Sequence, residues 1–378
     1  MTALTFDDQA AGQFRSFARD WLAAAVPDEW RSYTERGLSE QGELEVRAAW
    51  DRALAASRLR CLTWPERFGG RALGPVEELI FYEEAAAAGA PEERELIGKH
   101  LTGPALLDYG TPEQQSRYLP GISAATELWC EGLSEPGAGS DLAAVTTTAT
   151  PAPGGYRVSG RKIWTSFAHY ADWCFLLART SLTERKRHNL SVLLLDMRQP
   201  GVTVAPIRQI TGMHEFNEVT FDDAWVDEAD LLGGANEGWQ VVTIAGRRAS
   251  RGLGQAPRRY IHLRQELDRL IECSAQAGCG ADAVAEVADR LELYRWHLRR
   301  VAEANAADLE AGGPTSILML IFSETWQHLT RLGLTIGCPE HEGYWRRKYF
   351  ESRPSSLYGG SSELKRNVIA DRVLGLPR

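Results

Sequence analysis

A glycine-rich segment near residue 140 contains the first residues whose types and spacing could do chemistry. Gly137–Asp141 offers small side chains and unhindered backbone N–H groups, which let an anionic or planar ligand approach closely. A tight glycine turn would explain the same residues. The segment is not a dinucleotide fingerprint, because no GxGxxG follows a strand and opens a helix, and there is no Walker A motif. Its meaning therefore depends on its neighbours.

The segment belongs to an ordered series of motifs that runs to the end of the chain. The series is Ser134–Leu142, Gly154–Ser166, Ala171–Trp173, Ala178–Thr180, Phe216–Val219, Phe221–Asp223, Asn236–Trp239, Tyr358–Glu363 and Val373–Arg378. In this order and spacing the motifs resemble the acyl-CoA dehydrogenase family across essentially the whole chain. The resemblance implies FAD held between a β domain and a C-terminal helical bundle, usually in a dimer or tetramer.

The resemblance also implies contacts for the cofactor. Leu133 and Ser134 match the segment that hydrogen-bonds the pyrimidine side of the flavin. Trp164 matches the tryptophan that packs on the isoalloxazine, and Ser166 matches the hydroxyl that reaches N5, with Thr165 in the same cofactor-binding stretch. An apolar ring needs an aromatic wall, and N5 needs a donor to accept hydride.

Further contacts follow for the substrate and for the rest of FAD. Ser140 matches a serine at the pantetheine or thioester end of the substrate, while Ser361 and Glu363 match residues near the adenosine half of the flavin. The implied substrate is an acyl thioester of CoA or of an acyl-carrier protein. Electron-transfer flavoprotein or oxygen would accept the electrons, and the assembly is either homomeric or heteromeric.

The carboxylate that would accept the α-proton of the acyl thioester is missing from both of its usual positions. The resemblance places the catalytic glutamate directly after Tyr358, where the chain has Gly359, which can offer its N–H to a thioester oxygen but cannot accept a proton. The second position falls at or near Ala249, or at Arg247 if a short gap is allowed. The stretch 240–265 contains no Asp or Glu, so this conclusion does not depend on the alignment.

Three accounts remain open. A dehydrogenase with a relocated base is the first, with Glu131, just before Ser134, and His100 as candidates; a solvated glutamate and a loop histidine are their plain structural interpretations. The second is a base-lacking partner subunit of a two-subunit dehydrogenase. The third is other flavin chemistry, as in a monooxygenase or oxidase. A purely structural, non-enzymatic role belongs to a different class.

A cluster of arginines occupies the stretch in which the second glutamate is absent. Its members are Arg247, Arg248, Arg251, Arg258, Arg259 and Arg264. A charged helix surface explains them, and so does a basic patch for CoA phosphates, the flavin pyrophosphate or an acidic carrier protein.

Bulk properties exclude several classes of protein. The chain has 378 residues, 44% hydrophobic and 25% charged, and a net charge of -9 argues against general nucleic-acid binding. Its six cysteines show no CxxC pair and no metal-like histidine spacing, so free thiols and no metal are expected. No signal peptide and no apolar run of about 20 residues is present, which predicts a cytoplasmic protein away from membranes.

Hydrophobic periodicity predicts the elements that position these motifs. Residues 1–125 have helical spacing, 126–236 hold short β-forming runs separated by turn signals, and 237–378 return to helical spacing. The predicted fold is a multi-domain α+β protein with an N-terminal helical domain, a central β-barrel or sandwich, and a C-terminal four-helix bundle.

Overall fold

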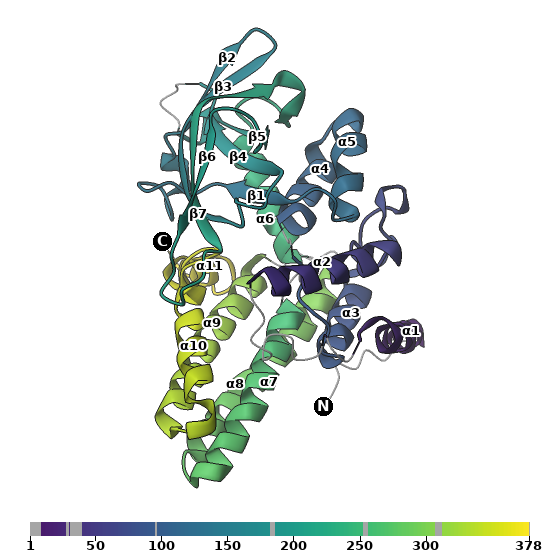
Figure 1. Cartoon of the computed structure of the whole chain (residues 1–378), viewed down its shortest axis with the longest axis vertical. Helices are drawn as coiled ribbons and strands as arrows, with labels where there is room; N and C mark the ends of the chain where they lie inside the picture. The colour runs from purple at the N-terminus through teal and green to yellow at the C-terminus, as the bar shows by residue number, and fades with distance from the viewer. Residues whose placement is uncertain are drawn as a thin grey trace. The chain divides into compact units, whose positions relative to one another are not determined.

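The computed structural model describes residues 9–27, 30, 40–94, 97–181, 186–251, 256–306 and 312–377. Its contacts divide the chain into two compact units (Figure 1). The helical unit comprises Met1–Ser39, Leu73–Pro91 and Ser250–Arg378. The sheet unit comprises Glu40–Ala72 and Glu92–Ala249. The N-terminal helical region is thus shared between the two units.

The sheet unit combines one sheet with several helices. Its helical elements are α2 (Glu40–Ala56), η3 (Glu66–Phe68), η4 (Gly98–Thr102), α4 (Gly103–Tyr109), α5 (Pro112–Ser123), η5 (Leu142–Ala144), η6 (Lys186–Asn189), η7 (Glu228–Asp230) and α6 (Gly238–Arg251). Its strands are β1 (Trp129–Gly132), β2 (Thr148–Ala152), β3 (Gly155–Ser166), β4 (Trp173–Arg179), β5 (Leu190–Asp196), β6 (Val202–Ile207), β7 (Phe216–Asp227) and β8 (Leu231–Leu232).

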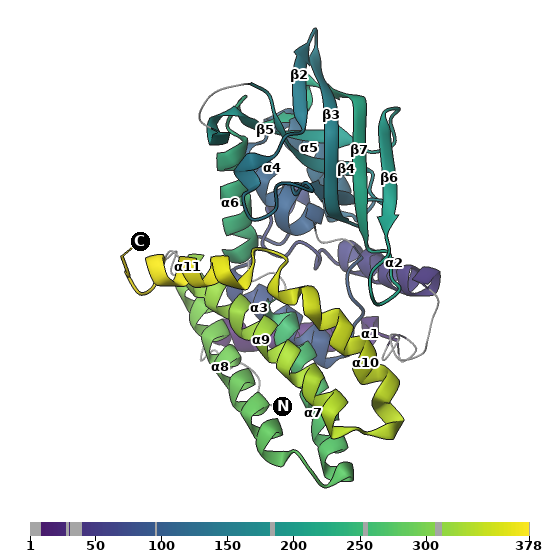
Figure 2. The ribbon, with the colours of Figure 1, turned by 90° about the vertical axis from the view of Figure 1, so that its left-hand side faces the viewer.

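Within the described residues these eight strands form one sheet in the order β6-β7-β3-β2-β4-β5-β8, and β1 pairs in parallel with β4 (Figure 2). The central strands β4 and β5 are apolar on both faces, because both faces are covered. Phe175 and Leu177 point into a core shared with α4, α5 and α6, whereas Leu176 and Ala178 point into a second core made by the strands. Continuous apolar runs, rather than alternation, result.

Local sequence signals explain where helix α5 begins. Gln114 N donates to Thr111 Oγ1 at 3.2 Å, and Thr111 N donates to Gln114 Oε1 at 3.0 Å, which forms a capping box at the start of α5. Pro112 occupies the first helical position, where its missing N–H is not needed. The Gln114 amide also donates to two carbonyls near η7, so this cap ties α5 to the sheet.

The helical unit has its own core. Its elements are α1 (Gln9–Ala25), α3 (Pro75–Ala87), α7 (Ala256–Ala277), α8 (Ala281–Ala306), α9 (Gly312–Ile336), η8 (Pro339–His341), α10 (Glu342–Ser352), η9 (Arg353–Ser356) and α11 (Ser362–Arg372). Helices α7, α8 and α9 pack along one another, with α10 against α9 (Figure 2). Leu263, Leu267, Leu298 and Leu329 are buried where they meet.

The predicted fold class is confirmed, with helices to Ser123, strands from Trp129 to Leu232, and helices again from Gly238. The domain boundaries at 125 and 236 stay a prediction, because the two compact units cut across them. Helix α10 lies within the stretch 237–378, for which the sequence predicted helical structure. No described helix has the length and apolar character needed to cross a membrane.

Candidate functional site

The segment after β1 is built around a tight turn. Glu135 and Ala138 exchange two backbone hydrogen bonds of 3.0 Å, which close the turn and leave the residues beyond it exposed. A Cβ added at Gly137 or Gly139 would meet no atom within 4 Å, so packing within the chain does not require these glycines. Ser140 lies exposed directly after them. The segment therefore presents open backbone beside an exposed hydroxyl, as a ligand-binding loop requires.

The Glu135 carboxylate holds this segment to the rest of the sheet unit. It accepts hydrogen bonds from Thr146 N at 2.6 Å, Thr146 Oγ1 at 2.7 Å and Thr147 N at 2.9 Å, and from Lys162 Nζ at 2.9 Å. Burial alone would raise the pKa of Glu135, but the Lys162 ammonium and these hydrogen bonds lower it to about 2. Glu135 is therefore a structural anion that stays charged.

The segment after β1 is also hydrogen-bonded to strand β3. Lys162 Nζ also donates to the Leu133 carbonyl at 3.0 Å, and Ile163 N donates to the Ser134 carbonyl at 3.0 Å. The structure thus brings Leu133 and Ser134 together with the strand that carries Trp164. Glu135 and Lys162 lie within the motifs described above, but no role was predicted for either residue. Lys162 is in phase with buried Val158 along β3, so strand alternation could have marked it as an inward-pointing lysine.

Trp164 is placed by an irregularity in β3. Between Lys162 and Thr165 the strand carries one residue more than β7, and Trp164 has φ 62°. A large residue in this left-handed region is rare and costs about 1–3 kcal/mol, so surrounding structure must hold it there. The indole is 56% exposed and touches Phe216 edge-to-face at 6.2 Å between centroids. The bulge turns an aromatic face out of the sheet.

The residues after Trp164 are fixed to β7. Thr165 pairs with Asn217 and Ser166 with Phe216, and the buried Asn217 amide donates to the Thr165 carbonyl at 3.2 Å. Thr165 is 1% exposed, which points its side chain inward, whereas Ser166 is only partly buried. Of these two hydroxyls, Ser166 is the one accessible to a ligand.

Glu131 lies on β1 opposite Phe175 and therefore faces the core shared with α4 and α5. Burial raises the pKa of its carboxyl above the ordinary glutamate value, and no charged group opposes that rise. Its carboxylate makes no hydrogen bond or ion pair within the described residues. Glu131 is therefore partly exposed, with its side chain directed toward the core.

His100 belongs to the π-helical turn η4, not to a loop. Burial first, and then the neighbouring Lys99 ammonium, lower the pKa of His100 to about 3, so the imidazole is neutral. Among the described atoms its Nε2 has no hydrogen-bond partner. π-Helical turns are frequent at functional sites.

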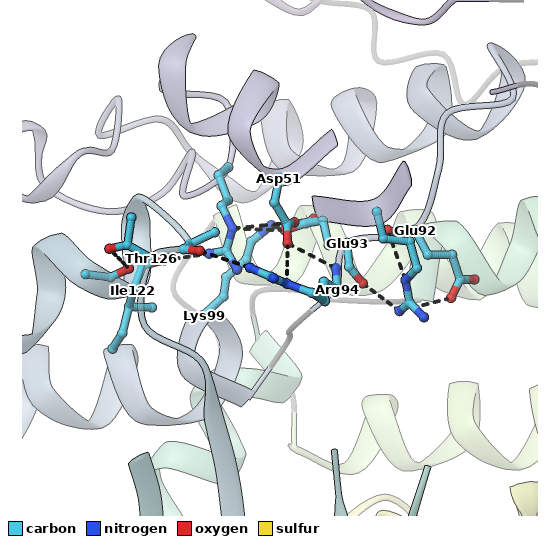
Figure 3. A network of polar contacts seen from close by, with 11 residues as sticks. Asp51, Glu92, Glu93, Arg94, Lys99, Ile122 and Thr126 are labelled. Carbon is cyan, nitrogen blue, oxygen red and sulfur yellow. Dashed lines mark hydrogen bonds and ion pairs between the residues drawn. The ribbon is translucent and has the colours of Figure 1, made fainter. Parts of the chain in front are cut away.

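A buried network of charges supports this turn (Figure 3). Lys99 Nζ contacts both Glu93 oxygens at 2.8 and 2.9 Å, and Arg60 lies 3.8 Å from both Glu93 and Asp51. Arg94 N donates to Asp51 Oδ2 at 3.2 Å. The network joins α2 to the segment before η4, and sequence spacing alone did not reveal it.

The other predicted residues belong to different elements of the chain. Gly359 (φ 62°) is exposed in the helical unit, and a Cβ added there would meet no atom within 4 Å. Ser361 caps α11, since Leu364 N donates to its Oγ at 3.4 Å, and Glu363 lies in the first turn of that helix, where a backbone hydrogen bond and then the Ser361 hydroxyl lower its pKa. Ala249 lies on α6, but its side chain and that of Arg247 fall outside the described part of the chain.

Comparison with known proteins identifies the family of this chain. Residues 8–126 match the N-terminal domain of acyl-CoA dehydrogenases and residues 130–224 match the middle domain. Acyl-CoA dehydrogenase IpdE1 of Mycobacterium tuberculosis is 40% identical over 98% of this chain and 99% of the relative. This chain belongs to the acyl-CoA dehydrogenase family.

Solved structures agree with the family assignment. The ChsE4-ChsE5 complex from Mycobacterium tuberculosis matches 100% of each chain at 26% identity with a TM-score of 0.80. PigA, solved with FAD and proline, matches 99% of this chain and all of its own at 18% identity and a TM-score of 0.82, which shows the shared fold alone. The recognition drawn from the motifs is confirmed.

The residues of this member of the acyl-CoA dehydrogenase family fit the FAD that the family implies. An isoalloxazine needs an aromatic surface and backbone donors, and the exposed Trp164 indole and the Leu133–Ser134 backbone come from two segments that Lys162 ties together. The open backbone at Gly137 and Gly139 leaves room beside them. FAD therefore suits the sheet unit, whereas the individual contact residues stay predictions.

Proposed function

We propose that this chain is an FAD-dependent dehydrogenase of an acyl thioester of CoA or of an acyl-carrier protein, with Glu131 as the proton acceptor. The main support is the Glu131 carboxylate, which is only partly exposed, has a pKa raised by burial, and makes no hydrogen bond or ion pair within the described structure. It lies on β1, just ahead of Leu133 and Ser134, in a chain that lacks a carboxylate at Gly359 and at Ala249.

Removal of the α-proton requires a base with a raised pKa. The α-proton of a thioester is weakly acidic, so a carboxylate removes it efficiently only when desolvation has raised the carboxyl pKa toward that of the substrate. FAD, when bound, supplies the hydride acceptor. Around it we assign Leu133, Ser134, Trp164, Thr165 and Ser166 to the flavin, and Ser140 to the thioester end of the substrate.

His100 is the weaker base of the two candidates. With a pKa of about 3, its imidazole holds a proton poorly at neutral pH, whereas burial drives the pKa of Glu131 in the useful direction. We therefore propose that His100 is a neutral polar group and not the base. Ser361 and Glu363 are proposed, on the family resemblance, as contacts of the adenosine half of FAD, in a dimer or tetramer that passes electrons to electron-transfer flavoprotein or oxygen.

The test is anaerobic bleaching of the flavin by acyl-CoA thioesters of several chain types. Glu131→Gln keeps the side-chain shape but cannot accept the proton, so we expect the bleaching rate to fall by about 10²-fold or more while flavin content stays unchanged. Glu228→Gln, at an exposed glutamate, is the matched control and should bleach like the parent. Parent-like bleaching by Glu131→Gln would exclude Glu131 as the base.

A second candidate function is the base-lacking subunit of a two-chain dehydrogenase. The ChsE4-ChsE5 match, which is to a complex of two proteins, favours it, as does the glycine at position 359. In that case the purified chain would not be bleached by any thioester, and bleaching would appear only with a second subunit. Glu131→Gln would then leave the rate of the mixed complex unchanged.

A further inference from the structure

Two cysteines and a histidine meet in the helical unit, and none of the three belongs to a motif discussed above. Cys273 lies on α7, Cys338 directly precedes η8, and His341 ends η8 and leads into α10. Their ligand atoms all lie within 4.8 Å of one another. Both cysteines are buried, whereas His341 is partly exposed. We propose that these three side chains form a structural Zn²⁺ site.

The donor set is the first argument. Two thiolates and one imidazole are soft and borderline ligands that Zn²⁺ binds strongly, and two thiolates neutralise its charge in a buried place. In a tetrahedral site with bonds of about 2.3 Å to sulfur and about 2.0 Å to nitrogen, the donors lie roughly 3.5–3.8 Å apart. Since the three donors lie within 4.8 Å of one another, they need to close by about 1.3 Å at most, a change within the range of side-chain rotation.

The backbone already holds two of the ligands in a chelating turn. His341 N donates to the Cys338 carbonyl at 3.0 Å, so the Cys-x-x-His segment closes on itself and brings both side chains to one side. The two-residue spacer lets one short segment supply two of the ligands that a structural zinc site needs. The third ligand comes from a different helix, so a bound ion would join α7 to the connection between α9 and α10.

The surroundings also suit a thiolate–metal centre. The Trp345 indole N–H and the Arg269 guanidinium lie near the Cys273 thiol. Trp345 is fully buried, and its Nε1 has no hydrogen-bond partner among the described atoms. An N–H next to a sulfur is a typical outer-sphere contact of a metal-bound thiolate.

A fourth position is available. Cys338 Sγ donates to Gln276 Oε1 at 3.3 Å, and Gln276 lies one helical turn beyond Cys273 with an exposed side chain. On loss of the thiol proton, the amide oxygen or a water molecule can complete the tetrahedron. The sequence did not suggest this site, because one Cys-x-x-His pair is uninformative until folding adds Cys273.

The test uses the full-length chain, purified with reductant, stripped with a chelator and titrated with ZnCl₂. We expect one Zn²⁺ per chain to survive gel filtration, and the thermal midpoint to rise with added Zn²⁺ because the ion binds only the folded state. His341→Asn and Cys338→Ser should each weaken Zn²⁺ binding by about 100-fold or more, since even outer-sphere changes cost 10–100-fold. His341 is partly exposed, so its variant tests the site even if Cys338→Ser misfolds.

Cys279→Ser is the matched control, because Cys279 is exposed and close in sequence to Cys273 but is not in the cluster. It should bind Zn²⁺ as the parent does. Equal Zn²⁺ retention by His341→Asn and by Cys279→Ser would overturn the proposal. So would failure of the reduced parent to hold Zn²⁺, or peptide mass spectra showing Cys273 and Cys338 joined as a disulfide in the isolated protein.

Discussion

Lys162 Nζ and Glu135 Oε1 lie 2.9 Å apart, with side chains 0% and 4% exposed. Burial lowers the pKa of Lys162 even though Glu135 opposes the change, so the ammonium is held in its place at an energetic cost. The pair connects the strand of Trp164 to the Leu133–Ser134 backbone. One interaction thus sets the separation of two segments that the flavin is expected to contact.

Removal of one member of this pair should be severe. Lys162→Met leaves the Glu135 charge buried without its cation, and we expect the free energy of unfolding to fall by about 3–5 kcal/mol, with loss of flavin from the purified protein. Urea unfolding and the flavin-to-protein absorbance ratio measure both effects. Arg161→Met, whose side chain is 54% exposed and 3.5 Å from Glu218, is the control and should change stability by about 1 kcal/mol or less. The double variant Glu135→Gln, Lys162→Met should be more stable than Lys162→Met, and a less stable double variant contradicts this account.

Asp51 should make the stability depend on pH in the direction opposite to most carboxylates. Burial raises the pKa of Asp51 to about 6, although Arg60 and Arg94 oppose the rise. A carboxyl with a raised folded pKa favours folding below its unfolded pKa, and this contribution is lost as pH rises from about 4 through about 6. The change amounts to roughly 3 kcal/mol.

The measurement is urea unfolding at several pH values for the parent and for Asp51→Asn. The difference between the two free energies of unfolding should change in favour of Asp51→Asn as pH rises across this window. Asn keeps an acceptor for the Arg94 backbone N–H, so the fold should survive. A difference that is constant with pH would show that Asp51 titrates normally.

Trp164 should matter for flavin binding and little for folding. Its indole is 56% exposed, so Trp164→Ala removes little buried surface, and release from φ 62° is not expected to destabilise the strand. We expect the FAD dissociation constant to rise by about 10-fold or more, because an aromatic contact is worth about 0.5–1.5 kcal/mol beyond its buried area. Trp296→Ala, at a tryptophan with the same 56% exposure, is the control for the fluorescence titration. Equal FAD affinity in the two variants would remove Trp164 from the site.

Gly359 should respond to alanine in the opposite way from another exposed glycine. Gly359 has φ 62°, so Gly359→Ala should lower the free energy of unfolding by about 1 kcal/mol, and Gly359→Asn by less. Gly343 lies on α10 with equally open space around it, and Gly343→Ala should raise stability by about 0.5 kcal/mol. Thermal unfolding of the three variants distinguishes backbone strain from packing. The same sign for both alanine variants would show that φ is not the cause.

Several residues of the proposed site could be predicted from the sequence because they lie in continuous motifs. Leu133, Ser134, Ser140 and Trp164 are short-range neighbours of glycine turns and strand ends, and the structure positions them by local devices such as the Glu135–Ala138 turn and the bulge at Trp164. Lys162 lies on the same face of its strand as the buried Val158, so strand alternation alone could have predicted that the lysine points inward.

The sequence by itself determined the family, the succession of helices and strands, and the absence of a carboxylate at Gly359, because motif order and hydrophobic period are properties of neighbouring residues. Only the tertiary structure decided that burial raises the pKa of Glu131, that His100 is neutral on a π-helical turn, and that Cys273 meets Cys338 and His341. A pKa and a ligand set depend on what packs against a side chain. Those neighbours come from distant parts of the chain and acquire their positions only when the units fold.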